Sequence, residues 1–591
     1  MLKKVRQMVA RGAPWWVTLL LGVACVALGA VVTAELSFSL SLLEWLVGAA
    51  LVLAGLSELA LAESSARPWL SRVVAAIWIL CGVVAVSQPE TTIRALAIVV
   101  GVGLVSGGAV KIYSAFLGDG DERFVVGLSG ITNVVVGGLA LSWPGVTVLV
   151  VAVLFGIRTV LFGVGQIALA IRLRGARPGE PVAQRRWPRS VRLVGTAAVL
   201  LIAMTGAVIS AKIGRAPAAP GAFYAAPSPL PAVPPGTIIR SEVIDGFRAG
   251  ATAYRVLYTS TGYDGRPTAV SGFIAVPDGP APAAGRRVLA YTHGTVGVAS
   301  NCAPSLVTRQ DQQPLFVEGG AEFLAAGYVI AASDYQGLGT PGPHPYLVGS
   351  SEAMNELDIV RAARNLTAAR AGSDFAVWGH SQGGHAALFT GQLAADYAPE
   401  LRLVGVAAGG PVPNFTDLFT ANVDNTIGRV LISMTLQSWS EVYDGARLQQ
   451  IVTPAARPIV TRIARNCLYD SNQILASVPG AVGLGRTFLS SLPQETEPWK
   501  TLAERNTPGN APTNAPLLIA QGAADTIVDP AITKRLVDKL CRNGETVEYR
   551  LAPGVGHLKT GQEAAPAVLR WINDRFAGKP APTSCAMKPN R

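Results

Sequence analysis

The sequence predicts a chain of two unlike parts: an α-helical transmembrane bundle, followed by an α/β domain with a mainly parallel sheet, helices on both faces and an inserted helical cap. Up to about residue 215, apolar runs are separated by short polar gaps. From residue 237 onward, short apolar runs of β type alternate with helical patterns, which is typical of a parallel sheet covered by helices. A serine flanked by glycines follows one of these runs.

Seven apolar segments in the N-terminal part have the length of membrane spans. A helix needs about 20 apolar residues to cross a hydrocarbon layer of ~30 Å. We place the segments near residues 15–34, 40–62, 69–89, 92–115, 124–143, 147–171 and 191–211. The alternative is a set of buried helices in a soluble protein, but such helices are shorter and carry a polar stripe.

The distribution of charge favours a lipid bilayer over nucleic acid as the partner of this basic chain. The net charge is +11, and residues 1–215 hold 19 Lys and Arg against 9 Asp and Glu, whereas the remainder holds 30 against 29. The basic excess therefore lies in gaps between apolar runs, as in the cytoplasmic loops of membrane proteins. We expect the N-terminus and the gap at 172–192 in the cytoplasm, and everything after Ile213 outside it.

The first six apolar segments repeat a helical hairpin three times. Gly55, Gly107 and Gly163 occupy similar places in the second helix of each hairpin, and small residues allow helices to pack closely in lipid. This pattern resembles the HdeD-like family of membrane proteins over about residues 15–172. We therefore divide the N-terminal part into a six-helix region, 1–172, and a basic cytoplasmic loop with a seventh transmembrane helix, 173–213.

A Pro- and Ala-rich segment, residues 214–236, leads to the α/β domain at 237–591. Repeated prolines prevent a helix, so an extended, semi-rigid spacer is expected. The alternative is that part of this segment packs on the α/β domain as an ordered arm.

The α/β domain contains eight expected strands and five expected helices. The strands are predicted at 252–258, 267–276, 287–292, 327–332, 374–378, 402–407, 516–520 and 546–551. The helices are predicted at 316–326, 351–370, 384–396, 530–542 and 563–575. The early strands could form an antiparallel edge of the sheet.

The sequence Gly379-His380-Ser381-Gln382-Gly383 lies between an expected strand and an expected helix. This setting is that of a nucleophile elbow, in which a sharp turn lifts the serine hydroxyl above the sheet and the glycines avoid clashes. The hydroxyl then also lies at the positive end of a helix. Ser381 is therefore the candidate nucleophile of an α/β-hydrolase fold.

A serine hydroxyl needs a base, and in this fold the base follows the last strand. Of the five histidines only His557 does so, and we interpret His380 and His385 as packing or surface groups. Asp525 directly follows the expected strand at 516–520, at the sheet edge that presents the site, and is the candidate acid. Asp529 is the alternative acid, although it is better placed to cap the next helix.

The oxyanion of a serine hydrolase needs preorganised N–H donors. We expect one donor to be the backbone N–H of Gln382, directly after the nucleophile. The other candidate is the backbone N–H of Thr295, since His293-Gly294-Thr295 follows the third expected strand. The alternative is that His293 and Gly294 only shape the turn.

Together these motifs resemble the secretory lipase family of α/β-hydrolases over about residues 237–575. The matching segments occur in the family's order and are His293–Thr295, Ser333–Gly339, Gly379–Gly383, Gln521–Asp525 and Gly556-His557. The resemblance implies hydrolysis of carboxylic esters, often lipid esters, without a metal or an organic cofactor.

Four cysteines, Cys302, Cys467, Cys541 and Cys585, fall on the expected outer side, where disulfides are stable. Four cysteines allow three pairings. We propose Cys302–Cys467 and Cys541–Cys585, two bridges of a kind that the family resemblance supports. No zinc site is expected, because the sequence has no C-x-x-C motif and no paired histidine spacing.

Residues 411–515 have helical patterns and interrupt the order of the strands, so we expect a cap over the active site. We expect its apolar residues either to face an acyl chain of the substrate or, as the alternative, only to pack against the core. These residues are Leu431, Ile432, Met434, Leu436 and Trp439.

The sequence thus predicts a membrane-anchored serine ester hydrolase of lipase or esterase type that acts outside the cytoplasmic membrane through an acyl-enzyme. The expected partners are a lipid or other ester substrate and the bilayer, and the sequence identifies no protein partner. Two other hypotheses stay open. One is an acyltransferase of the cell envelope with the same triad, and the other is a membrane sensor or transporter with an inactive hydrolase domain.

Overall fold

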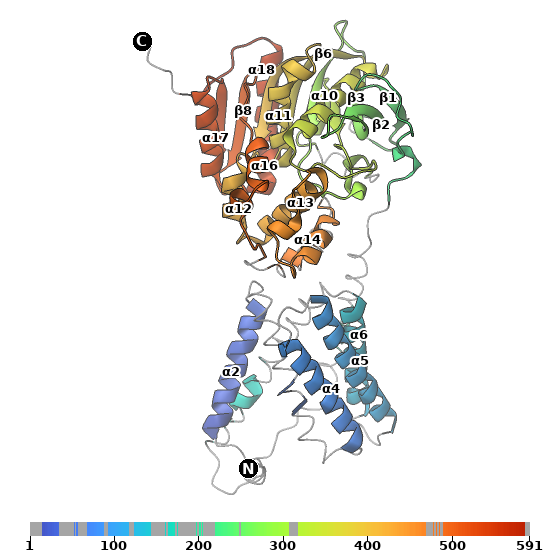
Figure 1. The fold of residues 1–591 in the computed structure, drawn as a ribbon, viewed down its shortest axis with the longest axis vertical. Coiled ribbons are helices and arrows are strands. Elements are labelled where there is room, and N and C mark those ends of the chain that lie inside the picture. Colours follow the sequence, from blue (N-terminus) through green and yellow to red (C-terminus); the bar gives the residue numbers. More distant parts are fainter. Residues whose placement is uncertain are drawn as a thin grey trace. The chain divides into compact units, whose positions relative to one another are not determined.

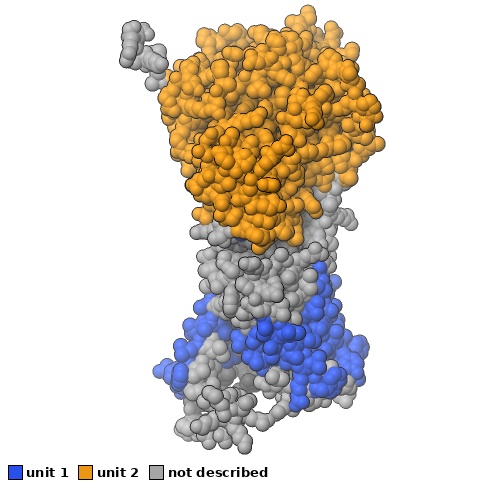
Figure 2. Space-filling model, viewed as in Figure 1, with its two compact units in different colours: residues 1–215, 482–485 blue, residues 216–481, 486–591 orange. Residues whose placement is uncertain are grey.

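The computed structural model describes residues 15–34, 68–87, 93–117, 123–142, 219–247, 250–306, 317–468 and 488–585, with scattered positions within 52–56, 160–204 and 477–484. The chain divides into two compact units (Figure 2). The first unit comprises Met1–Arg215 with Val482–Gly485, and the second comprises Ala216–Ala481 with Arg486–Arg591.

Long helices make up most of the described part of the first unit. They are α2 (Trp15–Ala34), α4 (Pro68–Ser87), α5 (Ile93–Leu117) and α6 (Arg123–Ser142) (Figure 1). Helices α5 and α6 approach closely because glycines lie at their interface. A methyl group on Gly108 would lie 2.6 Å from the carbonyl oxygen of Gly130, and one on Gly137 would lie 2.8 Å from that of Gly101.

These four helices coincide with four of the seven apolar segments predicted from the sequence. Among the residues that the structure describes, however, no helix is both long enough and apolar enough to cross a membrane. The predicted transmembrane bundle is therefore not confirmed. The segments predicted at 40–62, 147–171 and 191–211 lie largely outside the described residues.

The described part of the second unit is built on a nine-stranded sheet in the order β1-β2-β3-β5-β4-β6-β7-β8-β9. The first three strands pair antiparallel, β3 also pairs antiparallel with β5, and the strands from β5 to β9 in this order are parallel. All eight predicted strands are present, and β1 is an addition to them. The strands are β1 (Ile238–Val243), β2 (Ala251–Thr261), β3 (Pro267–Pro277), β4 (Arg286–Thr292), β5 (Val329–Ser333), β6 (Ala371–His380), β7 (Arg402–Gly409), β8 (Leu517–Gly522) and β9 (Val547–Ala552).

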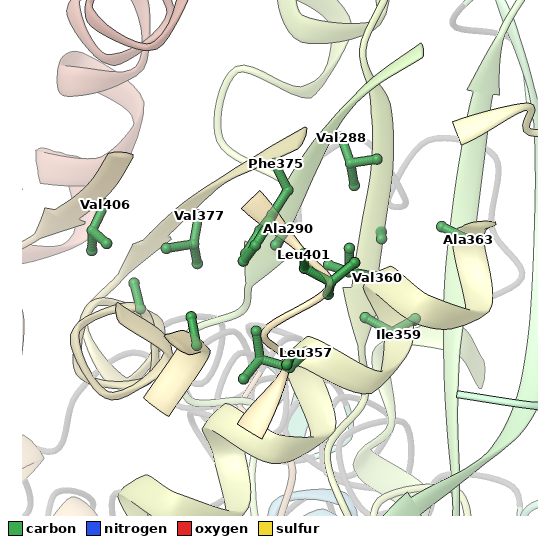
Figure 3. Packing of buried hydrophobic residues seen from close by; sticks show 14 of the residues in the cluster. Val288, Ala290, Leu357, Ile359, Val360, Ala363, Phe375, Val377, Leu401 and Val406 are labelled. Carbon is green, nitrogen blue, oxygen red and sulfur yellow. The ribbon is translucent and has the colours of Figure 1, made fainter. Parts of the chain in front are cut away.

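Helices cover both faces of this sheet, so its parallel strands are apolar on both sides. Helices α10 (Gly349–Asn365), α11 (Gln382–Tyr397) and α17 (Pro530–Arg542) pack on one face, and α9 (Gly320–Ala325) and α18 (His557–Phe576) pack on the other. Figure 3 shows Leu357 and Val360 of α10 near the buried side chains of Val288, Ala290 and Phe375. This two-sided burial of apolar surface is the main stabilising term of the domain.

Among the described residues between β7 and β8, α-helices occupy much of the segment predicted as a cap at 411–515, including α12 (Phe415–Asn422), α13 (Thr426–Val442), α14 (Arg457–Ala464) and α16 (Trp499–Arg505) (Figure 1). Trp439 of α13 lies in an aromatic cluster, with its ring 5.1 Å from Phe415 and 6.5 Å from Trp499. Ile432, Met434 and Leu436 are buried as well. These four side chains pack within the protein, which favours the second of the two predicted alternatives, whereas Leu431 is only partly buried.

Part of the Pro- and Ala-rich segment packs on the second unit as an ordered arm. Residues Ala222–Tyr224 form a short 3-10 helix, and Tyr224 is only 3% exposed. The Tyr224 hydroxyl shares a hydrogen bond of 2.9 Å with Ser305 Oγ. The guanidinium of Arg240 donates to the carbonyl oxygens of Phe223 and Ala225. Around Tyr224 the segment therefore matches the predicted alternative of an arm rather than that of a free spacer.

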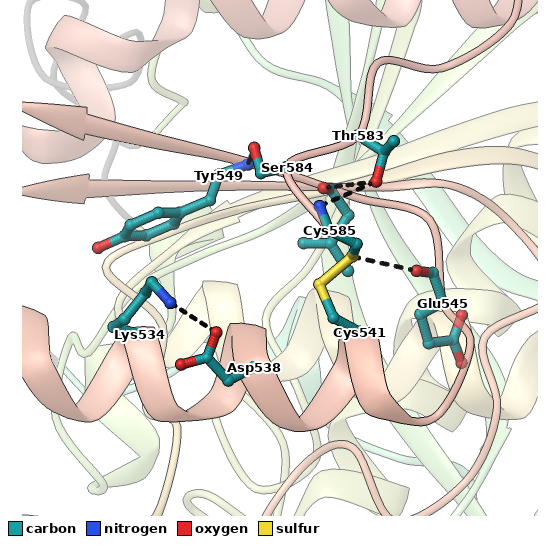
Figure 4. The surroundings of a disulfide bond; sticks show 9 residues. Lys534, Asp538, Cys541, Glu545, Tyr549, Thr583, Ser584 and Cys585 are labelled. Atoms are coloured by element: carbon teal, nitrogen blue, oxygen red, sulfur yellow. Dashed lines mark hydrogen bonds and ion pairs between the residues drawn. A yellow bond between two sulfur atoms is a disulfide. The ribbon is translucent and has the colours of Figure 1, made fainter. Parts of the chain in front are cut away.

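Two disulfides join distant segments of the second unit, with the pairings proposed from the sequence. Cys302–Cys467 links the loop after β4 to the cap. Cys541–Cys585 links α17 to the C-terminal tail, as Figure 4 shows. The backbone N–H of Ser584 also donates to β9 at 2.7 Å, so the tail is held by both a covalent bond and a hydrogen bond.

Docking of the arm beside β1 and β2 predicts an effect on stability. Replacing Tyr224 by Ala should lower the free energy of unfolding of the second unit by about 3–5 kcal/mol, because it leaves a cavity in place of a buried aromatic side chain. The measurement is chemical denaturation of the full-length protein, followed by tryptophan fluorescence. Val233→Ala, in the same segment but with an exposed side chain, should stay within about 0.5 kcal/mol of wild type. Equal stability of Tyr224→Ala and wild type would contradict docking of the arm.

Candidate active site

Ser381 occupies the tight turn between the end of β6 and the start of α11. Its backbone has φ 59° and ψ −120°, a conformation that an L-residue rarely adopts and that costs of order 1–3 kcal/mol. Neighbouring elements hold it in place. The N–H of Ser381 donates to the carbonyl oxygen of Gly409 at 2.8 Å, and its own carbonyl accepts from the N–H of His385 at 3.1 Å. The turn is thus the nucleophile elbow that the sequence predicts.

Two glycines of the elbow lie against Thr292, the last residue of β4. A methyl group on Gly379 would lie 2.0 Å from Thr292 Oγ1, and one on Gly383 would lie 1.9 Å from the Thr292 carbonyl oxygen. No side chain fits at either place. The close approach of β4 therefore explains why the turn needs glycine on both sides of the serine.

His557 connects Ser381 to Asp525. Its Nε2 lies 2.9 Å from Ser381 Oγ, and its Nδ1 lies 2.7 Å from Asp525 Oδ2. Because the carboxylate accepts from Nδ1–H, the neutral imidazole keeps Nε2 free to accept the serine proton. The three residues follow β6, β9 and β8, whose carboxyl ends lie at one edge of the sheet. His557 begins α18, six residues before the helix start predicted at 563.

Hydrogen bonds keep Asp525 ionised despite its burial. Burial raises the pKa of Asp525, but the hydrogen bond with His557, the imidazole charge and two backbone N–H groups outweigh it, so the pKa lies below the ordinary 3.8. The N–H groups of Ile527 and Val528 both donate to Oδ1 at 2.9 Å. Asp529, the alternative acid, instead accepts from a backbone N–H in the first turn of α17 and caps that helix.

The candidate base, His557, has a lowered proton affinity. Burial lowers the pKa of His557 below the ordinary 6.5, the hydrogen bond with Asp525 opposes this shift, and the neighbouring His380 lowers the pKa further. The ring centroids of His380 and His557 are 4.9 Å apart, and His380 Nδ1 lies 3.4 Å from the carboxylate of Glu318. His380 is thus a buried packing group, as expected, but its contact with the base is not evident from the sequence.

One predicted oxyanion donor, Gln382, belongs to the elbow, and the loop that carries the other, Thr295, passes beside it. Gln382 is the first residue of α11, and N–H groups in the first turn of a helix have no acceptor within the helix. Gly294 lies against the turn, since a methyl group there would be 3.9 Å from Ser381 Cβ. Among the hydrogen bonds of the described residues, none uses the N–H of Thr295. The residue before Thr295 thus lies against Ser381, and the roles of Gln382 and Thr295 as oxyanion donors stay predictions.

Comparison with known proteins assigns each part of the chain to a family. Residues 312–584 match the secretory lipase family, a range that includes Ser381, Asp525 and His557. The C-terminal domain belongs to the secretory lipase family. Residues 73–137 and 128–184 match a short repeat of unknown function, DUF308, which agrees with the repeated hairpins recognised in the sequence.

Relatives of the lipase domain differ in the activity that their names state. The "probable inactive lipase" of Mycobacterium tuberculosis is 27% identical over 383 residues, which cover 61% of this chain and 82% of that protein. The secreted triacylglycerol lipase of Malassezia globosa is 26% identical over 389 residues, which cover 61% of this chain and 80% of that protein. Among solved structures, Candida antarctica lipase A has a TM-score of 0.55 at 21% identity and covers 63% of this chain and 89% of its own. That likeness shows the α/β-hydrolase fold.

A buried carboxylate next to the elbow of the lipase domain is not predicted from the sequence. Glu352 of α10 accepts from Gln382 Nε2 and contacts His385 Nδ1, both at 2.8 Å, and His385 Nε2 lies 2.8 Å from the carbonyl oxygen of Asn506. This network connects α10, α11 and the cap. An acid in the first turn of a helix usually indicates a favourable dipole interaction at the surface, so the inward position of Glu352 becomes visible only in the tertiary structure.

His, Cys, Asp and Glu side chains of the described residues form no cluster that could hold a metal ion.

Replacing Asp525 by Asn in the lipase domain should lower kcat by about 10⁴-fold, because the amide no longer fixes the Nδ1–H tautomer of His557. The pH profile of kcat/KM should change too. Burial places the acid limb of the wild type below pH 6.5. Since Asp525 raises the pKa of His557, its loss should move this limb to still lower pH.

These profiles are measured by ester hydrolysis across the acidic range. Asp529→Asn is the matched control and should keep both the rate and the profile of the wild type. If Asp525→Asn kept full activity and Asp529→Asn lost most of it, Asp529 rather than Asp525 would be the acid.

Proposed function

We propose that this chain is a membrane-anchored serine carboxylic-ester hydrolase of lipase or esterase type, which acts outside the cytoplasmic membrane through an acyl-enzyme. The observation that carries the proposal is the unbroken series of hydrogen bonds from Ser381 through His557 to Asp525. It lies in a domain of the secretory lipase family. A lipid or another carboxylic ester is the proposed substrate, in line with the secreted triacylglycerol lipase among the relatives.

In the proposed reaction, His557 Nε2 takes the proton of Ser381 as the serine oxygen attacks the ester carbonyl carbon. The carbonyl oxygen becomes an oxyanion, which the N–H groups of Thr295 and Gln382 stabilise. The imidazolium then gives its proton to the departing alcohol oxygen, and the acyl group stays on Ser381. Water loses a proton to the same imidazole, attacks the acyl-enzyme and releases the carboxylic acid.

The proposed anchor is the apolar N-terminal part, and its orientation rests on charge. Residues 1–215 hold 19 Lys and Arg against 9 Asp and Glu, mostly in gaps that a cytoplasmic location would suit. The bonds Cys302–Cys467 and Cys541–Cys585 also favour an oxidising compartment for the hydrolase. We assign no chemistry to the DUF308 repeats.

Ser381→Ala in the full-length protein tests the nucleophile, with p-nitrophenyl esters of graded acyl length as substrates. Its kcat should fall by about 10⁶-fold, and labelling by a fluorophosphonate should disappear. Ser241→Ala, on the exposed face of the edge strand β1, should retain both properties. Equal rates from wild type and Ser381→Ala would remove Ser381 as the nucleophile.

The same assays separate the other two hypotheses. A wild-type protein that forms no fluorophosphonate adduct and hydrolyses no ester would favour the inactive hydrolase domain, the state named for the Mycobacterium tuberculosis relative. If an added alcohol captured the acyl group in preference to water, acyl transfer would replace hydrolysis as the function.

The proposed orientation predicts where Ser381 can be labelled. In intact spheroplasts of an expressing bacterium, a membrane-impermeant fluorophosphonate should label the protein as fully as it does after lysis. The Ser381→Ala variant gives the background. Labelling that appears only after lysis would place the hydrolase domain in the cytoplasm.

A further inference from the structure

The loop that follows β4, residues 293–306, is attached to the cap close to the proposed oxyanion donor Thr295. The carbonyl oxygen of Val296 accepts a hydrogen bond of 2.8 Å from the N–H of Leu468. Further along, the loop is joined covalently to the cap through Cys302–Cys467. The cap therefore contacts the loop one residue beyond Thr295.

Gly297 shows how closely the loop and the cap approach each other. It has φ +118°, and a methyl group there would lie 2.7 Å from both the Asn466 carbonyl oxygen and Cys302 Sγ. Only glycine fits between the two segments. Backbone lies directly against backbone here, which leaves this part of the loop little room to move.

A second contact fixes the side chain of Thr295. Its Oγ1 lies 2.8 Å from the hydroxyl oxygen of Tyr346, and Tyr346 is 2% exposed. Burial raises the pKa of Tyr346 well above its ordinary value, so the phenol is neutral and its hydroxyl hydrogen is present. Since a β-branched residue has few χ1 rotamers, holding Oγ1 also restricts the backbone of Thr295.

Tyr346 is in turn held by helix α13 of the cap. Its N–H donates to Ser438 Oγ at 2.9 Å, and its carbonyl oxygen accepts from Trp439 Nε1 at 3.0 Å. Ser438 Oγ also donates to the carbonyl oxygen of His344 at 2.6 Å. Both cap residues are buried. Tyr346 thus binds the cap through its main chain and Thr295 through its side chain.

We propose that Tyr346 is a positioning residue of the oxyanion hole, which couples the Thr295 N–H to cap helix α13. This inference rests on the proposed function, because it takes Thr295 as an oxyanion donor. Such a donor must be in place before charge develops on the substrate, and a misplacement of about 1 Å can cost 10²-fold in rate. Loss of the Tyr346 hydroxyl should therefore weaken binding of the transition state more than binding of the ester.

The test compares full-length wild type with Tyr346→Phe, which removes one oxygen and keeps the ring. With active sites counted by fluorophosphonate titration, kcat for a p-nitrophenyl ester should fall by about 10- to 100-fold while KM stays within about twofold. The affinity for a trifluoromethyl ketone, which mimics the oxyanion when Ser381 adds to it, should fall by the same factor as kcat/KM. Tyr328→Phe is the matched control and should change none of these values, because its buried hydroxyl binds Asn573 instead.

A double-mutant cycle separates the Thr295–Tyr346 contact from a general effect on packing. Thr295→Val loses the hydroxyl and keeps the shape, so it should match Tyr346→Phe, and the double variant should show no further loss. Thr295→Ser keeps the hydroxyl and should retain most of the activity. If Tyr346→Phe does not fold, the comparison of Thr295→Val with Thr295→Ser still tests the contact.

Two results would overturn the inference while leaving the proposed function intact. In the first, the wild type is active, and the kcat values of Tyr346→Phe and Thr295→Val both lie within about twofold of the wild-type value. Such a change is far smaller than the loss expected for an oxyanion donor. The other is a pair of losses that simply add in the double variant. By contrast, a wild type no faster than Ser381→Ala would overturn the proposed function itself, and the inference with it.

Discussion

The candidate active site depends on the parallel pairing of β4, β6, β7, β8 and β9. Carboxyl ends of parallel strands meet at one edge of a sheet, so Thr295, Ser381, Asp525 and His557 follow strands that end near one another. The pairing also buries polar groups, which is unfavourable unless they are hydrogen-bonded. Asp525 meets this condition through two backbone N–H groups, and His557 meets it by using one ring nitrogen for Asp525 and the other for Ser381.

Helix α10 places further acids in the core and satisfies them in different ways. Glu352, Glu356 and Asp358 are each at most 1% exposed. Glu352 binds the side chains of Gln382 and His385, and Asp358 forms an ion pair of 2.8 Å within its own helix. Burial raises the pKa of Glu356 well above its ordinary value, which favours its protonated form. Hydrogen bonding, pairing and protonation are thus three ways in which this helix reduces the cost of a buried carboxylate.

The strands and the elbow are predictable from the sequence because both are local patterns. A strand buried on both faces is a continuous apolar run, such as Val329–Ser333. The elbow is indicated by glycines two residues before and after a serine, between a strand and a helix. Strand β1 is not predicted, because Ile238–Val243 is an edge strand whose residues are mostly exposed and therefore form no continuous apolar run. The docking of Tyr224 is predicted only as an alternative, because the surrounding prolines also indicate a spacer. The roles of Glu352 and Tyr346 depend on distant segments that each residue meets only in the folded domain, and no local pattern carries that information.

The cap has to satisfy two conditions that restrict each other. The proposed function requires the domain to admit a substrate, yet the cap is bound to the loop that carries Thr295. If α13 moved as a rigid body, it would break its hydrogen bonds to Tyr346 or carry Thr295 with it. The bonds at Val296 and Cys302 impose the same restriction on segment 466–468. A preorganised oxyanion hole keeps its donors fixed during the reaction, so the rigidity of these two parts of the cap would also set the geometry of the proposed oxyanion hole.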